Sequence, residues 1–388
     1  MIDFKTASLK EILNHKTMYY DKIDFSFIKK SYDIISKYIK LPYVIHIVGT
    51  NGKGSTGRFL AHYLVKKSYK TLHYSSPHIL KFNERIWLNG TNSSNFELSF
   101  ASKKLQQYLP TNLLEKLTYF EYTTLLAIVL SDNLDFLILE AGLGGEFDAT
   151  NVVKNDLSLI TTIDLDHQSF LGDTVEEIAR TKMRSVDNKM IIGYQIHDEV
   201  YETSEIVKNE LKLEFDRDIV IQSVKEFDKY SLNEKFAKYL KTNLHLVIEA
   251  LNELKIDLDL KLFDDVELFG RCQKVAPNIT IDVGHNPLAA RVLAKEFEGR
   301  KVHLIYNSYK DKDYKKVIKI LTPIISKITI IEIEDKRIIN KNNLLDFCKS
   351  LNIIIDNFDE IKENEEYLVF GSFLVVEKFI KNMGFNEK

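Results

Sequence analysis

The chain contains a short glycine-rich segment whose residue types suit the binding of a phosphate chain. It reads Gly49-Thr50-Asn51-Gly52-Lys53-Gly54-Ser55. Glycines let a backbone approach phosphate oxygens without a Cβ clash, and the N–H groups that open the following helix attract anions. Lys53 is placed to reach the β- and γ-phosphates, and the Ser55 hydroxyl to bind Mg²⁺. The segment therefore predicts a site for ATP.

Its spacing departs from the common phosphate-loop pattern G-x-x-x-x-G-K-[ST]. Ile47 stands at the first glycine position, with Gly49 two residues later, and Gly54 separates Lys53 from Ser55. The alternative interpretation is a tight strand-to-helix turn that binds no ligand. A lysine and a serine directly after a strand favour the phosphate site over that alternative.

Other chemically capable side chains also follow predicted strands. Glu140 ends one strand directly before the glycine-rich turn 141–145. Ligands of open α/β sheets bind beyond the carboxyl ends of the strands, so we expect a Mg²⁺ ligand here rather than a surface carboxylate. His167 follows another strand; a ligand or phosphate contact and a structural histidine are equally good interpretations of it, and Asp166 could orient its ring.

The last third of the chain repeats this arrangement. Segment 281–287 places an acid, Asp282, after a strand and before a glycine turn that carries His285. A functional site and a plain helix cap by Asn286 are equally good interpretations of this segment.

These residues need a framework of alternating strands and helices, and the sequence provides one. Residues 43–48 form a short continuous apolar run, typical of a buried parallel strand. Further strands are predicted at 71–74, 134–139, 157–163, 279–283, 302–306, 328–333 and 367–370, with two more candidates within 189–222. Helical spacing marks 1–40, 56–67, 122–130, 174–180, 235–254, 287–297, 313–322 and 373–383. The alternation predicts an α/β protein with an N-terminal, P-loop NTPase-like domain of mostly parallel strands, residues 1–265, and a smaller, Rossmann-like C-terminal domain, residues 266–388.

Composition excludes several classes of protein. The 388 residues include 53 basic and 56 acidic side chains, and a net charge of -3 gives no electrostatic case for nucleic acid or a membrane surface. The two cysteines, Cys272 and Cys348, have no metal-binding spacing and suit a reducing compartment. The N-terminus lacks the apolar core of a signal peptide, and no apolar run approaches the roughly 20 residues of a bilayer span. We expect a cytoplasmic, monomeric enzyme that acts on small molecules.

Six segments, taken in order, make the chain resemble the folylpolyglutamate synthase/dihydrofolate synthase family, within the Mur-ligase-type ATP-dependent amide ligases. They are GTNGKGS at 49–55, SSPHILKFNERIWLNG at 75–90, TYFEYTTLLA at 118–127, LEAGLGGEFDATN at 139–151, DHQSFLGDTVEEIARTK at 166–182 and DVGHNP at 282–287. One such segment could arise by chance, whereas six in the correct order are specific. The resemblance extends from about residue 25 to about residue 380.

The resemblance implies roles for individual residues. The loop 49–55 would form the phosphate cradle, with further nucleotide contacts from Asn243, Arg271 and Asp282. The metal ligands would be Ser55, Ser76, Glu140, His167 and Lys182, the last as a carbamate that turns a cation into an anionic ligand. The pteroate contacts would be Thr118, Tyr119, Phe120, Glu121, Phe147, Asp148 and Ala149. Lys53, His167, Lys182 and His285 would take part in catalysis, His285 near the phosphates or the incoming glutamate.

The implied activity is ATP-dependent addition of L-glutamate to dihydropteroate, to reduced folate glutamates or to both, through an acyl phosphate and with two Mg²⁺ ions. The family pattern is not kept everywhere. Tyr119 replaces a phenylalanine, Glu146 replaces a basic residue, and Thr181-Lys182-Met183-Arg184 replaces Glu-Lys-Ala-Gly. Two alternatives stay open: a Mur-type ligase for another amino acid, against which segment 118–121 argues, and a P-loop ATPase that binds a partner and forms no amide.

Overall fold

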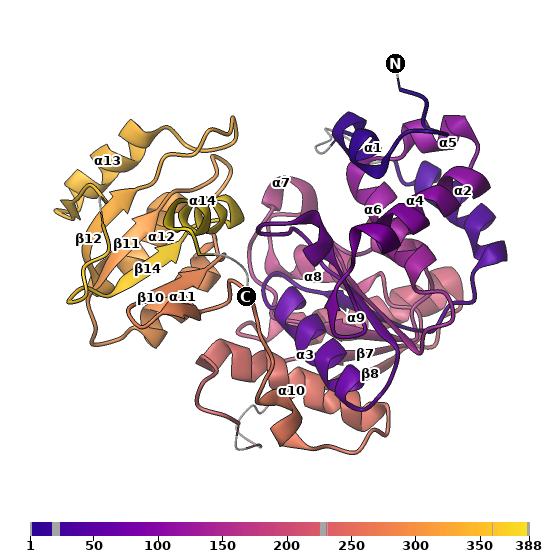
Figure 1. The fold of residues 1–388 in the computed structure, drawn as a ribbon. Helices are drawn as coiled ribbons and strands as arrows, with labels where there is room; N and C mark the ends of the chain where they lie inside the picture. The colour runs from indigo at the N-terminus through magenta and orange to yellow at the C-terminus, as the bar shows by residue number, and fades with distance from the viewer. Residues whose placement is uncertain (1, 18–23, 226–229, 231, 359, 386–388) are drawn as a thin grey trace. The chain divides into compact units, whose positions relative to one another are not determined.

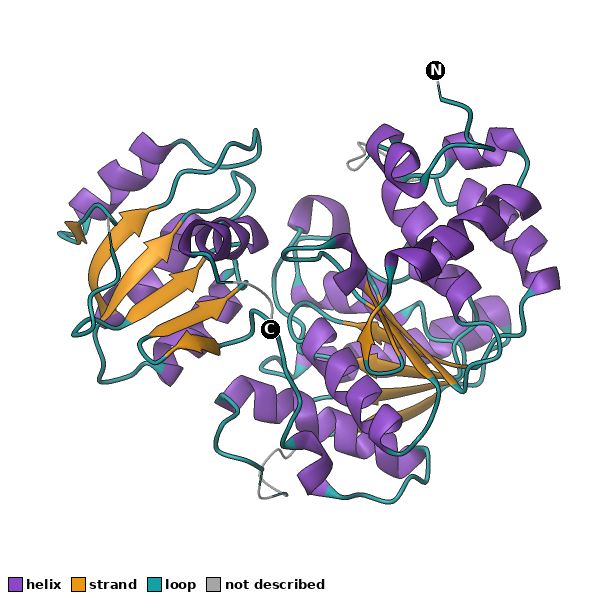
Figure 2. Cartoon of the chain, viewed as in Figure 1, coloured by secondary structure: helices purple, strands orange, loops and turns teal. Residues whose placement is uncertain are grey.

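The computed structural model describes residues 2–17, 24–225, 230, 232–358 and 360–385. The chain divides into two compact units, one of Met1–Asn233 with Leu240–Val266 and the other of Glu234–Tyr239 with Glu267–Lys388. Each unit is built on its own sheet with helices packed against it (Figures 1 and 2). The predicted α/β class, with two mostly parallel sheets, is therefore confirmed.

The first unit contains an eight-stranded sheet in the order β4-β3-β2-β5-β1-β6-β7-β8. Its strands are β1 (Tyr43–Val48), β2 (Thr71–Tyr74), β3 (Ile86–Leu88), β4 (Thr91–Asn92), β5 (Phe136–Glu140), β6 (Leu157–Ile160), β7 (Lys189–Ile192) and β8 (Val220–Ser223). The six strands from β2 to β8 in that order run parallel. An antiparallel hairpin of β3 and β4, which the sequence did not reveal, extends the sheet beyond β2.

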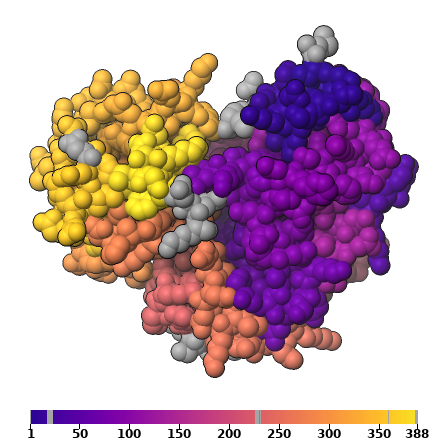
Figure 3. All heavy atoms as spheres, in the orientation of Figure 1, coloured from indigo at the N-terminus to yellow at the C-terminus, as the bar shows by residue number. Residues whose placement is uncertain are grey.

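Helices cover this sheet and pack against it to form apolar cores. They are α1 (Leu9–His15), α2 (Ser26–Ile35), α3 (Lys53–Lys66), α4 (Asn95–Tyr108), α5 (Thr111–Lys116), α6 (Tyr119–Leu130), α7 (Gln168–Leu171), α8 (Val175–Met183), α9 (Glu199–Phe215) and α10 (Lys238–Glu253). One core joins α2, α4 and α6 to β2 and β5, and another joins α8 and α9 to β6 and β7. The N-terminal helices gather at one end of the unit with α4 and α5 (Figures 1 and 3).

The helical prediction for residues 1–40 was wrong in its continuity. Among the described residues of this stretch, α1 ends at His15, and α2 gives way to a 3₁₀ turn at Ser36–Tyr38 well before Pro42. Lys16 leaves α1 with extended backbone, and its buried ammonium donates to the carbonyls of Leu114 (2.6 Å) and Leu117 (2.7 Å). A tertiary contact therefore accompanies the end of α1, and no local sequence signal encodes that contact.

The second unit contains a six-stranded sheet in the order β13-β12-β11-β14-β10-β9. Its strands are β9 (Gln273–Ala276), β10 (Ile279–Asp282), β11 (Val302–Tyr306), β12 (Ile325–Ile330), β13 (Ile354–Ile355) and β14 (Tyr367–Phe370), and its helices are α11 (Pro287–Glu296), α12 (Tyr314–Leu321), α13 (Lys341–Ser350) and α14 (Phe373–Met383). Only the edge strand β9 runs antiparallel to its neighbour. The predicted bounds of β14 and α14 are reproduced residue for residue.

Strand register in the first sheet determines which side chains can meet. Ile47 of β1 lies beside Glu140 of β5, Val48 beside Ile160 of β6, and Tyr74 of β2 beside Leu139. The carboxyl ends of four neighbouring parallel strands therefore form one edge, which is where open α/β sheets bind ligands. The phosphate loop, Ser76, Glu140 and the segment that leads to His167 all begin at this edge.

Candidate functional site

Two glycines give the phosphate loop its shape. Gly49 has φ 152° and Gly52 has φ 95°, conformations that side-chain-bearing residues rarely adopt. A Cβ on Gly49 would overlap the Thr161 hydroxyl, and a Cβ on Gly52 would stand 2.5 Å from Asn243 Oδ1. Only glycine fits at either position, so the two residues shape the loop against β6 and α10.

The loop is tied to the segment that follows β6. The backbone N–H groups of Thr50 and Asn51 both donate to the carbonyl of Thr162, at 3.0 and 3.2 Å. The Thr50 hydroxyl donates to the carbonyl of Asp164 at 2.9 Å. Lys53 Nζ donates to the carbonyls of Gly49 (3.0 Å) and Thr50 (3.2 Å), so this ammonium already lies over the loop at the start of α3.

Three buried polar atoms in or beside the loop lack a hydrogen-bond partner among the described residues. They are Ser55 Oγ, Thr56 Oγ1 and Asn243 Nδ2. Buried polar groups are nearly always hydrogen-bonded, and one that is not calls for a ligand, an ion or water. A hydroxyl oxygen on the first turn of α3 suits a hard cation such as Mg²⁺, and an amide N–H₂ beside Gly52 suits a nucleotide acceptor. The residues present therefore fit both groups.

The predicted metal ligands begin from the same sheet edge. Glu140 ends β5 with 6 % of its surface exposed, and its Oε2 accepts from the backbone N–H of Ser76 at 3.3 Å. His167 has a left-handed backbone (φ 51°) and a half-exposed ring. Asp166 Oδ1 accepts from the backbone N–H of His167 at 2.9 Å and lies 4.0 Å from its Nε2, so this carboxylate fixes the turn more directly than the ring. Within the described ranges no three His, Cys, Asp or Glu side chains are grouped for a metal; the predicted set relies on hydroxyls and a modified lysine as well.

Lys182 has a strongly lowered pKa. It is 4 % exposed on α8, and burial lowers the pKa of its amine to about 7, with the nearby charge of Lys53 adding to the effect and Asp166 and Asp148 opposing it. No described residue hydrogen-bonds to its Nζ. A lysine that is neutral near pH 7 is a nucleophile, which is the property that reaction with carbon dioxide needs.

The predicted pteroate residues have two kinds of surroundings. Thr118 and Glu121 form a capping box at the start of α6. The Asp148 carboxylate accepts hydrogen bonds from the backbone N–H of Leu143 and from the N–H and hydroxyl of Thr150. Both carboxylates therefore hold the local backbone in place. Burial raises the pKa of Asp148 and of Glu121.

The aromatic residues among the predicted pteroate contacts have different surroundings. The Phe120 ring lies against Gly142, and Phe147 is 61 % exposed. Tyr119 packs under Arg85 at 5.3 Å, and Ala149 is buried.

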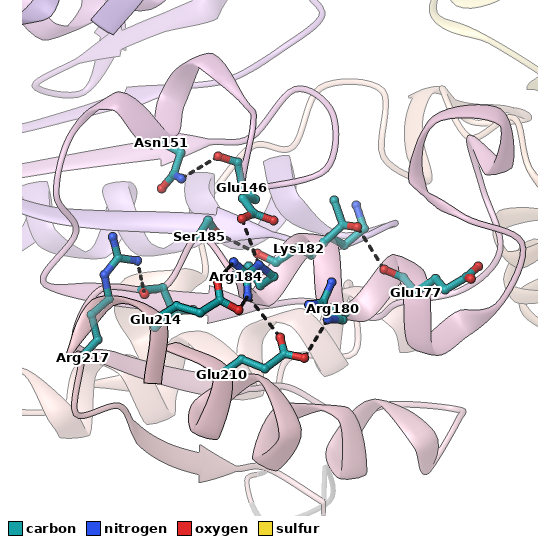
Figure 4. Close-up of polar contacts among 12 residues, drawn as sticks. Glu146, Asn151, Glu177, Arg180, Lys182, Arg184, Ser185, Glu210, Glu214 and Arg217 are labelled. Carbon is teal, nitrogen blue, oxygen red and sulfur yellow. Dashed lines mark hydrogen bonds and ion pairs between the residues drawn. The ribbon is translucent and has the colours of Figure 1, made fainter. Parts of the chain in front are cut away.

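Glu146 and Arg184, two departures from the family pattern, contact each other (Figure 4). Arg184, at the end of α8, is 7 % exposed and reaches Glu146 (2.9 Å), Glu210 (3.2 Å) and Glu214 (2.6 Å). These ion pairs raise the pKa of the guanidinium above its usual value, and the pair with Glu214 contributes most. The network links the loop after β5 to α8 and α9 beside Lys182.

In the second unit, Asp282 ends β10 and is 5 % exposed. Its carboxylate accepts from the Tyr239 hydroxyl (2.8 Å) and from the backbone N–H groups of Cys272 (2.9 Å) and Gly284 (2.7 Å), and burial raises its pKa. Asn286 Oδ1 accepts from Ala289 N at 2.9 Å, which confirms the helix-cap interpretation for Asn286.

The remaining predicted residues of this unit lie close by in the chain. His285 Nδ1 lies 3.2 Å from the carbonyl of Val283, and the Arg271 guanidinium lies 5.3 Å from the Phe373 ring.

Several residues that support the site escaped the sequence analysis. Thr162 and Asp164 hold the phosphate loop through their carbonyls, a role open to any residue type and therefore without a sequence signal. Gln195, beyond β7, bonds the same segment from its other side.

Known proteins of one family are similar to this chain in sequence. No family model matches the chain. The Haemophilus influenzae dihydrofolate synthase/folylpolyglutamate synthase is 31% identical over 87% of this chain and 88% of its own length. The Escherichia coli protein of the same name is 30% identical over 86% of this chain and 85% of its own.

Solved structures give the same result. The Helicobacter pylori folylpolyglutamate synthetase crystal structure is 35% identical, with a TM-score of 0.75, over 97% of this chain and 98% of its own. A Yersinia pestis bifunctional folylpolyglutamate synthase/dihydrofolate synthase, 23% identical with a TM-score of 0.83, shares the fold over 98% of this chain and 99% of its own. With this identity extending over nearly the whole length of both partners, the chain belongs to the dihydrofolate synthase/folylpolyglutamate synthase family.

Proposed function

We propose that this protein is an ATP-dependent ligase that forms an amide between L-glutamate and the carboxylate of dihydropteroate, of a reduced folate glutamate, or of both. The observation that carries the proposal is the sheet edge of the first unit. There Lys53, the buried Glu140 and the Ser55 hydroxyl, which has no partner in the described part of the chain, share one edge with the loop that carries Phe147. A phosphate cradle beside an exposed aromatic side chain suits a substrate that joins a planar ring to a carboxylate.

Amide formation from a carboxylate needs activation, because an oxide is a poor leaving group. In the first step a substrate carboxylate oxygen attacks the γ-phosphorus of ATP, the bond to the β-γ bridging oxygen breaks, and ADP leaves with that electron pair. Lys53 would offset charge on the transferred phosphoryl group, and the N–H groups at the start of α3 would hold the phosphate oxygens.

In the second step the amine nitrogen of glutamate attacks the carbonyl carbon of the acyl phosphate. The bond from that carbon to the phosphate oxygen breaks, inorganic phosphate leaves, and the nitrogen loses a proton. Water must be excluded in this interval, because it would hydrolyse the acyl phosphate. We assign ATP and glutamate contacts to Arg271, Asp282 and His285 of domain 266–388, and a further nucleotide contact to Asn243 of domain 1–265.

Bound Mg²⁺, in two ions, would supply positive charge to the phosphate oxygens. Ser55, Ser76, Glu140 and His167 are its proposed ligands, together with Lys182 as a carbamate. The lowered pKa of Lys182 supports this modification, since the neutral amine is the form that attacks carbon dioxide. Intact-mass measurement of protein kept in bicarbonate tests it: we expect a gain of about 44 Da that Lys182→Met abolishes, and a plain amine in active enzyme would contradict it.

The function is tested by Lys53→Ala, with Lys66→Ala on the same helix as the control. We expect the first variant to lose glutamate addition by at least about 10²-fold and the second to keep it. The assay measures ADP release with glutamate and either dihydropteroate or tetrahydrofolate. Full ligase activity of Lys53→Ala would contradict the site. ADP release at the full rate without glutamate would favour a P-loop ATPase, and turnover with a different amino acid would favour another ligase.

A further inference from the structure

The ladder between β6 and β7 ends just before the segment that holds the phosphate loop. Ile160 pairs with Ile192, and Gly193 N donates to the carbonyl of Ile160 at 2.8 Å. Residues 161–163, predicted as the end of this strand, lie outside it. Thr161 and Ile163 are nevertheless buried, so their backbone groups must be hydrogen-bonded.

The side chain of Gln195 continues the ladder in place of a strand. It is 4 % exposed, its Oε1 accepts from the backbone N–H of Ile163 at 2.8 Å, and its Nε2 donates to the carbonyl of Thr161 at 3.1 Å. Nε2 also donates to the carbonyl of Gly193 at 3.0 Å. A primary amide carries the same acceptor and donor as a peptide group, so this side chain bonds residues 161 and 163 as a parallel neighbour would.

The phosphate loop lies on the other side of the same segment. Thr161 N donates to the carbonyl of Val48 at 2.9 Å, and the carbonyl of Thr162, between the two residues that Gln195 holds, accepts from both Thr50 and Asn51. Gly49 fits so closely against the Thr161 hydroxyl that no Cβ could enter. A shift of residues 161–163 would therefore move the loop that is proposed to hold the phosphates.

We propose that Gln195 is a positioning residue for nucleotide binding, which it serves by fixing residues 161–163 and, through the Thr162 carbonyl, the phosphate loop. The proposal rests on the assignment of loop 49–55 to ATP. Gln195 acts through the backbone and contacts no phosphate itself. The backbone N–H of Gln195 donates to the Tyr201 hydroxyl at 3.0 Å, so α9 in turn supports it.

The first test compares Gln195→Ala with Gln222→Ala, a glutamine of β8 whose amide donates to Glu249 at 3.2 Å. Calorimetric titration of each full-length variant with Mg²⁺ and the analogue AMPPNP gives the nucleotide Kd, and steady-state assays give KM for ATP and kcat. We expect Gln195→Ala to raise Kd and KM for ATP at least about tenfold, because a loop displaced by a fraction of an ångström loses several phosphate contacts together. We expect Gln222→Ala to bind as the wild type does. A Kd for Gln195→Ala within twofold of the wild type, with only the Tm lowered, would overturn the proposal.

A second variant keeps the test decisive if Gln195→Ala does not fold. The Gln195→Glu side chain exists in two forms. The protonated acid can accept a hydrogen bond from Ile163 N and donate one to a carbonyl, as the amide does. The ionised carboxylate has no hydrogen to donate and faces the carbonyls of Thr161 and Gly193. We expect the Kd of this variant for AMPPNP, divided by the wild-type Kd at the same pH, to fall as the pH is lowered from 8 to 6. Asp164 and His197, whose side chains lie 3.2 Å apart near this segment, are present in both proteins, so dividing by the wild-type Kd cancels their contribution.

A ratio of one at every pH would overturn the inference. Failure of the wild type to bind nucleotide would instead contradict the proposed function, so the two failures are distinguishable.

Discussion

The backbone carbonyl of Lys182 occupies the place where a side chain on residue 145 would have to stand. Gly145 therefore lets the loop after β5 lie directly on the last turn of α8, and Glu146 N donates to the carbonyl of Thr181 at 3.0 Å in the same contact. The Lys182 carbonyl also accepts from the Ser185 hydroxyl at 2.7 Å. The loop that bears Phe147 and the helix that bears Lys182 are thus held together through their backbones.

Gly145→Ala should separate the two segments. The Cβ would meet backbone atoms of Lys182, which cannot rotate away, so we expect overpacking to lower the free energy of unfolding by about 1–3 kcal/mol. We expect kcat to fall more than about tenfold as well, since Lys182 moves with the backbone. Urea denaturation and the ligase assay measure the two effects.

Gly299→Ala is the matched control for this loss. Its Cβ would meet nothing within 4 Å, but its φ of 78° strains any other residue by roughly 1–2 kcal/mol. It should lower stability to a similar extent and leave kcat unchanged. If both variants lost activity equally, instability alone would explain the effect of Gly145→Ala.

Lys182 should make stability depend on pH. Its folded pKa of about 7 lies below the usual value of 10.5, so between these pH values the unfolded chain binds a proton that the folded chain lacks. The free energy of unfolding therefore rises with pH in this window, by at most about 1.4 kcal/mol per pH unit. Below pH 7 both states are protonated and the cost of the buried charge is fully present.

Lys182→Met removes this titration while keeping an unbranched side chain. We expect the variant to exceed the wild type in stability at pH 7 and its lead to shrink towards pH 10, in urea denaturation with carbon dioxide excluded. Lys10→Met, at an exposed site on α1, should follow the wild type at every pH. A constant difference between Lys182→Met and the wild type would argue that the amine is not titrating as described.

Ser55→Ala should separate binding from stability. Because the buried Ser55 hydroxyl has no partner among the described residues, its removal should change the free energy of unfolding by no more than about 0.5 kcal/mol. If the oxygen binds Mg²⁺, the affinity for Mg²⁺ and ATP should fall at least about tenfold. Thr56→Val, which removes the neighbouring buried unpartnered hydroxyl, should leave that affinity unchanged. Equal nucleotide binding by Ser55→Ala and the wild type would remove Ser55 from the metal site.

The Arg184 network should contribute to stability through charge balance. Arg184→Met leaves Glu146, Glu210 and Glu214 without their shared cation; these carboxylates are partly exposed, so we expect a loss of about 1–3 kcal/mol rather than the larger cost of a fully buried pair. Adding Glu210→Gln and Glu214→Gln should recover part of it. Arg180→Met, which removes a half-exposed partner of Glu210 alone, should cost less than about 0.5 kcal/mol. No recovery in the triple variant would mean that packing, not charge, is what Arg184 supplies.

The sequence predicted the framework better than the supports of the site. Strand β14 is a continuous apolar run, and α8 begins directly after the predicted cap, Thr174; both signals are local in the sequence. The whole of α4 was missed, as was the hairpin of β3 and β4 that precedes it. Asp148 stays a predicted substrate contact, and the sequence did not reveal that its carboxylate also accepts hydrogen bonds from Leu143 and Thr150. The role of Gln195 depends on where β7 ends, and no spacing of residues encodes that.

Lys53 has one further consequence for turnover. Its ammonium donates hydrogen bonds to the carbonyls of Gly49 and Thr50. When a triphosphate binds, the hydrogen bonds of Lys53 to these two carbonyls are therefore replaced by contacts with anionic phosphate oxygens, and the carbonyl hydrogen bonds form again when ADP leaves. Breaking them reduces the net free energy of nucleotide binding. When ADP leaves, the carbonyls of Gly49 and Thr50 can again accept hydrogen bonds from Lys53, so the ammonium keeps its partners.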